Sequence, residues 1–366
     1  MITVDDEWQK FCENEGGFIP ENSPVTNEKD QKFPKCGDIY ISTKTKIAYL
    51  NMKIPLQEIF WKIPVIKYFV PEEGVIKKQI KINSDTAIAV TELDKRLSII
   101  ENCSVDIISQ IDNPNARKIK YKDVRKINIG ICKKDLTTYR KKKRGAFYNC
   151  FVILLRLKYK GKFKEIHVKV FNTGKLEIPG IQYDDLLTLT LDRLVSLLSP
   201  YFTEKLSYNA DDIQTVLINS NFDCRFEIDR DKFYDILKYK YNLNVTYDPC
   251  SYPGIQCKYY HRPLKQHLQK KPGVCSCEIQ CGKKNRNKKH KNKDTKDDCL
   301  EISFMIFRTG SILIVGHCEE DILYLIYEFL KVILKDEYNN IKTISNVPRK
   351  KKSKKKLHKK TIILTI

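Results

Sequence analysis

The sequence lacks the long apolar run that a membrane-spanning helix needs. No stretch of its 366 residues approaches the roughly 18 consecutive apolar residues that cross a bilayer, so we expect no contact with membranes. The first ten residues also lack the basic region and apolar stretch of a signal peptide and contain acidic side chains instead. We therefore expect a protein that is not secreted.

Motifs of the common enzyme classes are missing as well. The sequence contains no Walker loop, no His-Glu-x-x-His motif, no nucleophile elbow and no acidic pair with metal-binding spacing. We predict that the protein is not an enzyme. Scattered carboxylates could still converge in the fold, which leaves an enzyme acting on nucleic acid as an alternative.

Positive charge is what the chain has in excess. It contains 67 Lys and Arg against 45 Asp and Glu, a formal charge of +22, which favours a polyanionic partner such as nucleic acid. General solubility, or a Lys-rich host, is the alternative explanation. Three basic segments stand out, at 140–144, 283–296 and 349–360, and we expect the second and third to contact phosphates without reading sequence.

The apolar fraction of 42% is enough for a folded core. The 13 cysteines, without a signal peptide, indicate a reducing compartment and thiols that are buried or bound to metal. Cys150 and Cys224 lie in strand-like runs and are predicted to be buried.

One group of cysteines has the density of a metal site. Four thiolates at Cys275, Cys277, Cys281 and Cys299 could bind a structural Zn²⁺ ion and so order a loop that has almost no apolar residues. Cys257, His261 and His267 are alternative ligands, and reduced surface thiols are the alternative to zinc.

The chain contains an internal repeat. Residues 168–180 and 304–316 both read as a strand, Phe, a Thr-Gly turn, a second strand that ends in Gly, and then a long apolar helix. Gly at the turn tolerates a positive φ. The surrounding elements recur in the same order, which indicates a duplication. The predicted elements are strands 39–43, 146–157, 164–171 and 175–178 with helices 50–62 and 184–198, then strands 215–228, 254–260, 300–307 and 311–315 with helices 231–239 and 319–334.

This pattern predicts an α+β fold in which each half supplies an antiparallel sheet with helices on one face. Two such halves side by side form one continuous curved sheet, and its helix-free face is left open to a ligand.

Three segments of the second half resemble the TATA-box-binding protein family. Residues 223–228 (Asp-Cys-Arg-Phe-Glu-Ile) look like the end of the first strand of that family's second repeat. Residues 246–255 resemble its Tyr-x-Pro-x-x-Phe-Pro-Gly-Leu segment, and residues 306–310 its Ile-Phe-x-Ser-Gly hairpin. Long insertions and the Lys- and Asn-rich composition look most like the divergent members encoded by large nucleocytoplasmic DNA viruses.

The resemblance implies a saddle of two repeats, with helices on the convex face, plus insertions. The predicted parts are an irregular leader at 1–37, a first repeat at 38–202 with an insertion at 63–146, a second repeat at 213–338 with a Cys- and Lys-rich insertion at 261–299, and a basic tail at 339–366. We expect residues 74–82 to form an extra strand within the first insertion.

The family binds double-stranded DNA in the minor groove and bends it with aromatic wedges, and is itself a standard example of this mechanism. Carried over residue by residue, the wedges fall on Phe171, Phe307 and Tyr252, with the fourth near Phe147 or, as the alternative, Phe151. A core position is the other reading of each ring.

Other positions match the family only in part. Its paired asparagines fall on Ile39 and Leu217, and neighbouring Asn219 and Asn221 could substitute for them. Leu313 and Val315 would present apolar surface to the groove, and Lys175 matches a basic position of the family, whereas Ser311 does not. Glu177 and Pro179 depart from the pattern, which favours a relaxed A·T preference.

The resemblance implies a transcription-initiation factor that binds A·T-rich promoter DNA and recruits transcription factors and RNA polymerase subunits. It would act in the cytoplasm, in a viral factory or virion, or in the nucleus of the host cell. The alternative is a scaffold protein of a replication or virion complex that binds nucleic acid without bending it.

Overall fold

The computed structural model describes residues 33–137, 147–262, 271–275 and 299–343. The chain divides into two compact units, 1–34 and 35–366, and the elements below belong to the second. No helix in the described ranges is long and apolar enough to cross a membrane.

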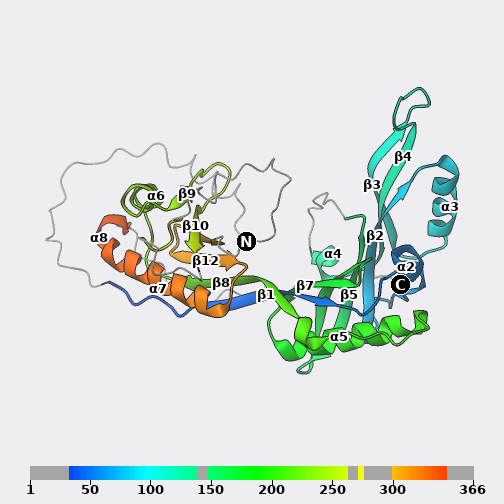
Figure 1. Cartoon of the computed structure of the whole chain (residues 1–366), viewed down its shortest axis with the longest axis horizontal. Helices are drawn as coiled ribbons and strands as arrows, with labels where there is room; N and C mark the ends of the chain where they lie inside the picture. The colour runs from blue at the N-terminus through cyan, green and yellow to red at the C-terminus, as the bar shows by residue number, and fades with distance from the viewer. Residues whose placement is uncertain (1–32, 138–146, 263–270, 276–298, 344–366) are drawn as a thin grey trace. The chain divides into compact units, whose positions relative to one another are not determined.

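Among its described residues, the first half of this unit contains seven strands and four α-helices, and Figure 1 shows their arrangement. In chain order they are β1 (Tyr40–Tyr49), α2 (Leu56–Lys62), β2 (Gly74–Ser84), α3 (Ala87–Ser98), β3 (Cys103–Asp112), β4 (Tyr121–Gly130), α4 (Lys133–Thr137), β5 (Cys150–Tyr159), β6 (Lys162–Phe171), β7 (Lys175–Ile181), α5 (Asp184–Leu198) and a 3₁₀ turn, η1 (Ser199–Tyr201).

The second half repeats the scheme with fewer strands. It contains η2 (Ala210–Asp212), β8 (Gln214–Asp223), α6 (Arg230–Asp235), the π-helical turn η3 (Ile236–Lys240), β9 (Asn244–Thr246), β10 (Ile255–His261), β11 (Leu300–Ile306), β12 (Ser311–Gly316), α7 (Glu320–Asp336) and α8 (Tyr338–Ile341).

The strands of the described residues join one open antiparallel sheet in the order β3-β4-β2-β5-β6-β7-β1-β8-β12-β11-β10-β9. The two halves meet where β1 pairs with β8, with Thr43 opposite Asn219 and Thr45 opposite Leu217. The predicted α+β class, with a continuous antiparallel sheet, is confirmed.

The sheet order gives β2 a different role from the one expected. Reading outward from the centre, the first half runs β1-β7-β6-β5-β2 and the second β8-β12-β11-β10-β9. β2 therefore occupies the same place as β9 and is part of the repeat rather than an extra strand. The additional elements are α3, β3, β4 and α4, which follow β2 in the chain.

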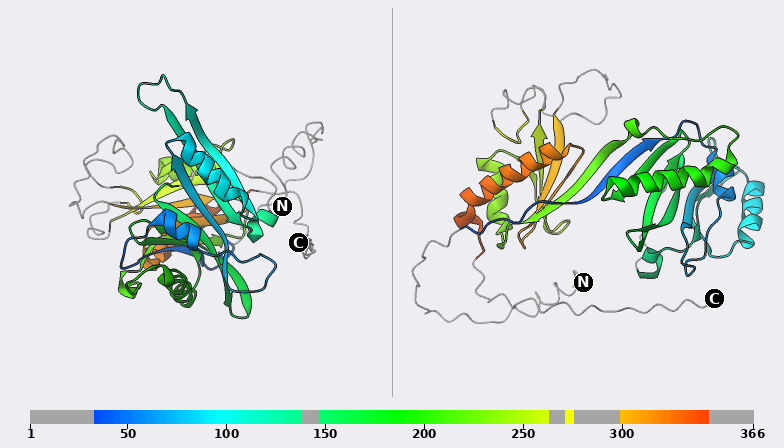
Figure 2. Two further views of the ribbon diagram at one scale, coloured as in Figure 1. Left: turned by 90° about the vertical axis from the view of Figure 1, so that its right-hand side faces the viewer. Right: turned by 90° about the horizontal axis from the view of Figure 1, so that it is seen from below.

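Helices cover one face of the sheet, here called the helix face. Side chains at alternate positions of a strand point to the same face, and in β8 Ile218, Ser220 and Phe222 are buried. The ring of Phe222 packs edge-on against Tyr327 of α7, with ring centroids 4.9 Å apart. Seen from below, α5 and α7 each lie in front of the strands of their own half (Figure 2).

One short helix lies on the opposite face. α4 is tied to that side because the carboxylate of Asp135 accepts a hydrogen bond from Lys77 Nζ, 2.8 Å away, and because Glu165 accepts one from the backbone N–H of Lys133. Lys77 and Glu165 point away from the helix face, since their strand neighbours Lys78 and Ile166 lie on it: Lys78 donates to carbonyls at the end of α2, and Ile166 belongs to the buried core. The sequence resemblance placed every helix on the convex face, and this five-residue helix of the inserted region is the exception.

Three predicted boundaries are corrected. The helix expected at 50–62 begins only at Leu56, and the strand expected at 215–228 ends at Asp223. In both cases the intervening backbone turns to bind the repeated hairpin, as described below. The expected tail at 339–366 also begins too early, because Ile341 of α8 is fully buried and the following residue, Lys342, pairs with Ile228.

Candidate nucleic-acid interface

The face opposite the long helices brings together most of the residues that the sequence analysis selected. Leu313 and Val315 of β12 lie opposite Asn221 and Asn219 of β8, and cross-strand partners share a face. All four are half-buried, whereas Ile312 and Ile314 between them are fully buried. We call this surface the open face; its central members are Thr43, Thr45, Lys175, Glu177, Pro179, Leu217, Asn219, Asn221, Leu313 and Val315.

The centre of the open face differs from the sequence mapping in its first half. Ile39 precedes β1, and Thr43 instead takes the position that mirrors Leu217, because Thr43 pairs with Asn219 and Thr45 with Leu217. Asn219 Nδ2 donates a hydrogen bond to Thr43 Oγ1 at 3.2 Å. Thr43 and Thr45 were missed because the family motif contains asparagine there and because bulges shift the β1–β8 register on either side of them, so no sequence signal marks these positions.

The two hairpins have the same backbone geometry. Gly174 and Gly310 have φ values of 84° and 85°, and their N–H groups donate to the carbonyls of Phe171 and Phe307, both at 3.0 Å. The carbonyl of Gly174 accepts from Leu50 N–H at 2.9 Å, and that of Gly310 accepts from Cys224 N–H at 2.9 Å. Because of these bonds the helix expected at 50–62 starts later than predicted and the strand expected at 215–228 ends earlier. The same bonds hold Phe171 and Phe307 at equivalent positions of the two repeats.

In the second half the aromatic residues at this end form a pair. The rings of Tyr252 and Phe307 are 5.9 Å apart and edge-on. Gly254 lies between them, and a Cβ there would be 3.1 Å from each ring. Tyr252 also donates a hydrogen bond from its hydroxyl to Met305 Sδ at 3.5 Å. Both rings are half-buried, so they keep an accessible edge.

In the first half the aromatic residues are accompanied by lysines. Phe147 is 62% exposed, with Lys169 Nζ 5.7 Å from its ring centroid, and Lys175 Nζ lies 5.6 Å from the ring of half-buried Phe171. The alternative wedge, Phe151, is wrong: it is fully buried on the helix face beside Phe60, with ring centroids 6.2 Å apart.

The carboxylate of Glu177, which departs from the family pattern, is neutralised by a neighbouring lysine. Glu177 forms an ion pair with Lys169 on the neighbouring strand, 2.5 Å away. Burial and then the charge of Lys169 lower the pKa of His167 on the same face to about 4, so this imidazole is neutral at pH 7. An unpaired carboxylate would repel DNA, whereas this pair is neutral overall.

The predicted zinc ligands and basic segments are only partly within the described residues. The sulfur atoms of Cys275 and Cys299 are 3.9 Å apart, while Cys277, Cys281 and the alternative ligand His267 lie outside them. Cys257 is buried on the helix face next to Phe304. Within the described ranges no three His, Cys, Asp or Glu side chains are grouped as a metal site. The three basic segments also fall outside.

Comparison with known proteins finds a viral protein similar in sequence and an archaeal protein among the solved structures. No family model matches the chain. Over 348 residues it is 22% identical to a TATA-box-binding protein-like protein of Acanthamoeba polyphaga mimivirus, covering 92% of this chain and 79% of the relative. Among solved structures it is similar to the TBP of Methanococcus jannaschii, with a TM-score of 0.36 and 12% identity over 81% of this chain and 98% of that one. The resemblance predicted from the sequence, including that to a viral member, is confirmed by the mimivirus relative.

Proposed function

We propose that this protein, a relative of a viral TATA-box-binding protein-like protein, binds double-stranded DNA through its open face and acts as a transcription-initiation factor. The observation that carries the proposal is the pair of equivalent hairpins that hold Phe171 and Phe307 at repeat-related positions. Aromatic side chains in such positions can enter a base step from the minor groove, unstack it and bend the duplex.

The chemistry of the open face favours a groove contact over a phosphate contact at its centre. Leu217, Leu313 and Val315 are apolar, and Asn219 and Thr43 supply short polar groups between them. This combination suits the shallow minor groove, where readout is mostly A·T against G·C. We propose a preference for A·T-rich DNA that is weaker than strict recognition of one promoter sequence.

The proposal assigns the protein no catalytic step. Its partners would be transcription factors and RNA polymerase subunits that recognise the protein together with bent promoter DNA. A scaffold that binds nucleic acid without bending it is the competing function, and it predicts equal affinity for A·T-rich and G·C-rich duplexes.

A matched pair of valine substitutions tests which face binds. Val315→Glu places a carboxylate on the open face, and Val332→Glu places one on the outer surface of α7, where Val332 is 57% exposed. We expect Val315→Glu to weaken binding of an A·T-rich duplex by about 100-fold, since a new charge at a desolvated contact is costly, and Val332→Glu to leave it unchanged. The measurement is fluorescence anisotropy with a labelled duplex.

Thermal unfolding of both variants provides the control for folding. Equal affinity of folded Val315→Glu and Val332→Glu would place the DNA contact elsewhere and contradict the proposal.

We also propose that the loop between β10 and β11 binds one zinc ion through Cys275, Cys277, Cys281 and Cys299. The 3.9 Å between the Cys275 and Cys299 sulfurs supports this, because two thiolates bound tetrahedrally at about 2.3 Å from zinc lie about 3.8 Å apart.

Elemental analysis of the purified protein tests the zinc site. We expect one zinc per chain, lost in Cys299→Ser and kept in Cys250→Ser, which changes an exposed thiol in another loop. Wild-type protein without stoichiometric zinc would end this proposal.

A further inference from the structure

The sheet has a break between β6 and β7. β6 pairs with β5 over ten residues, from Lys162 to Phe171, but its described register with β7 covers only Lys169 opposite Glu177 and Val170 opposite Leu176. β7 meanwhile continues beside β1 as far as Ile181. The segment 162–168 of β6 therefore runs along the edge of an opening inside the sheet.

The sequence of β7 explains the break. Pro179 has no N–H to offer a ladder, and Gly180 has φ of 85°, which turns the backbone away. The second half is different: β11 and β12 stay paired to Ile302 opposite Gly316. A Cβ at Gly316 would be 2.9 Å from Ile302, whereas one at Gly180 would meet nothing within 4 Å. The opening is thus specific to the first half.

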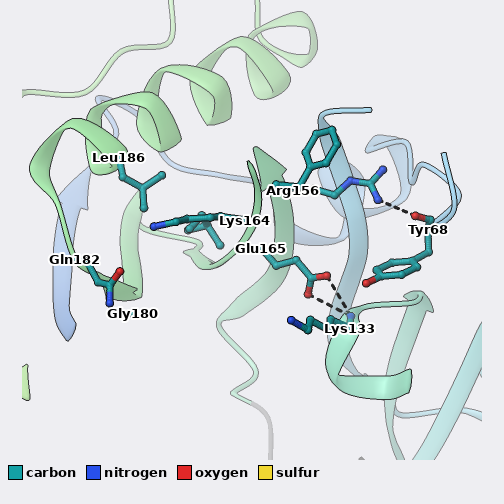
Figure 3. A pocket seen from close by; sticks show the side chains of 10 residues that line it. Tyr68, Lys133, Arg156, Lys164, Glu165, Gly180, Gln182 and Leu186 are labelled. Carbon is teal, nitrogen blue, oxygen red and sulfur yellow. Dashed lines mark hydrogen bonds between the residues drawn. The ribbon is translucent and has the colours of Figure 1, made fainter. Parts of the chain in front are cut away.

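The opening contains a cavity of about 610 Å³ (Figure 3). Its apolar part comes from Phe163 and Ile166 of β6 and from Leu186 of α5, and Gly180 and Gln182 form the opposite wall. Lys164 extends from β6 toward Gly180 in Figure 3. Since alternate residues of a strand direct their N–H and C=O groups to the same neighbour, about half of the backbone groups of 162–168 face this space.

The charged side chains that line the opening are net positive: Lys133, Arg156 and Lys164 against Glu165, whose carboxylate accepts a hydrogen bond from the backbone N–H of Lys133. Lys133 is exposed at its rim, and the β5–β6 hairpin beside it adds Lys158, Lys160 and Lys162, all exposed. Arg156, which also lines the cavity, is occupied by carbonyls and donates to Tyr68 O at 2.7 Å and Glu72 O at 2.8 Å. Lys160 is paired with Asp185, whose carboxylate oxygen is 4.0 Å away. Lys133, Lys158, Lys162 and Lys164 are therefore the lysines that a ligand would meet.

We propose that an extended, acidic segment of a partner polypeptide inserts here and pairs with β6 as an added strand. Strand addition to an exposed edge supplies main-chain hydrogen bonds, and pockets for alternate side chains supply specificity. Side chains on one face of the segment would contact Ile166 and Leu186, and carboxylates on the other would meet Lys133 and the hairpin lysines. About seven residues, or roughly 23 Å of strand, would fill the edge. This inference goes beyond DNA binding and needs no DNA.

A peptide titration tests it. The probe is a fluorescent eight-residue peptide of alternating valine and glutamate, measured by anisotropy without DNA. Two control peptides separate the contribution of main-chain hydrogen bonds from that of negative charge. One carries N-methyl groups on its valines and cannot form the full set of strand hydrogen bonds, and the other has lysine in place of glutamate. We expect both controls to bind at least about tenfold more weakly.

Charge-reversal variants locate the peptide-binding site on the protein. Lys133→Glu with Lys164→Glu should weaken the acidic peptide about tenfold or more, since both charges are reversed. Lys118→Glu with Lys120→Glu, in the loop between β3 and β4, makes the same change of charge and should have no effect.

Hydrogen exchange separates strand addition from charge attraction. Bound peptide should slow exchange of those amides of 163–168 in β6 that face the opening rather than β5. Binding without this protection, equal binding of the N-methylated peptide, or preference of the site for single-stranded oligonucleotide over the peptide would each overturn the proposal. Because no DNA is used in the peptide assay, its failure leaves the proposed DNA-binding function untouched.

Discussion

Gly174 and Gly310 are the residues on which the two hairpins depend. Each has a positive φ, and each is so close to the loop it docks on that a Cβ has no room: 2.4 Å from Met52 O at Gly174 and 2.2 Å from Phe226 O at Gly310. The Thr-Gly repeat in the sequence therefore reflects a packing requirement as well as a turn.

Substitution of Gly310 by alanine should destabilise the fold more than substitution of another positive-φ glycine. Gly310→Ala adds a backbone clash to the conformational strain, and we expect it to lower the free energy of unfolding by about 3 kcal/mol or more. Gly161→Ala has positive φ but nothing within 4 Å of its Cβ, and should cost only about 1–2 kcal/mol. Urea denaturation measures both values, and an equal cost would show that the hairpin tolerates a shift.

Residue identities on the open face were predictable where repeat and family motif agreed. Phe171 and Phe307 were selected on both grounds and Tyr252 on the family motif alone, and the structure leaves all three half-buried at hairpin or loop ends. Thr43 could not be found in the same way, because β bulges shift the β1–β8 register between Ile41 and Thr43 and no motif marks them. The DNA contacts of all four residues remain predictions.

At the scale of elements, α2 is fixed to β2 by a buried lysine. Lys78 Nζ donates to the carbonyls of Phe60 and Ile63 at 2.7 and 2.6 Å, which satisfies two carbonyls at the helix C-terminus. Lys78 is 4% exposed, and burial lowers its pKa to about 8. The charged form is therefore less favourable in the folded than in the unfolded chain.

Because of Lys78, the free energy of unfolding should change with pH in the alkaline range. Between about pH 8 and 10.5 the unfolded chain still binds the proton that folded Lys78 has lost, so the contribution of Lys78 to stability rises with pH in that window. Across this window the unfolding free energy of wild type, minus that of Lys78→Met, should increase by up to about 3 kcal/mol. Denaturant titrations across the window test this, and a constant gap would contradict the shifted pKa.

Element order was easier to predict than element boundaries. The hairpins and the helices α5 and α7 follow from period and turn chemistry, since Gly and the apolar spacing mark them. The role of β2 could not be predicted, because its partner β5 lies more than 60 residues away in sequence and the equivalent strand β9 has only three residues. Strand pairing over such separations leaves no local signal.

At the scale of the whole molecule, duplication joins two half-sheets through β1 and β8 and leaves their shared open face with a repeat-related hairpin at Phe171 and at Phe307. The inserted strands β3 and β4 extend the same sheet beyond the repeat. The molecule thus combines a duplicated body, to which we assign DNA binding, with first-half additions that have no counterpart among the described residues of the second half.

The most direct test of the central claim is the end-to-end distance of an A·T-rich duplex, measured by fluorescence resonance energy transfer with dyes at its two ends. Wild-type protein should shorten this distance. Phe171→Ala and Phe307→Ala should each abolish the shortening while much of the salt-sensitive binding and a cooperative unfolding transition are retained. A duplex that stays straight when wild-type protein is bound, or that bends equally with both alanine variants, would contradict the account.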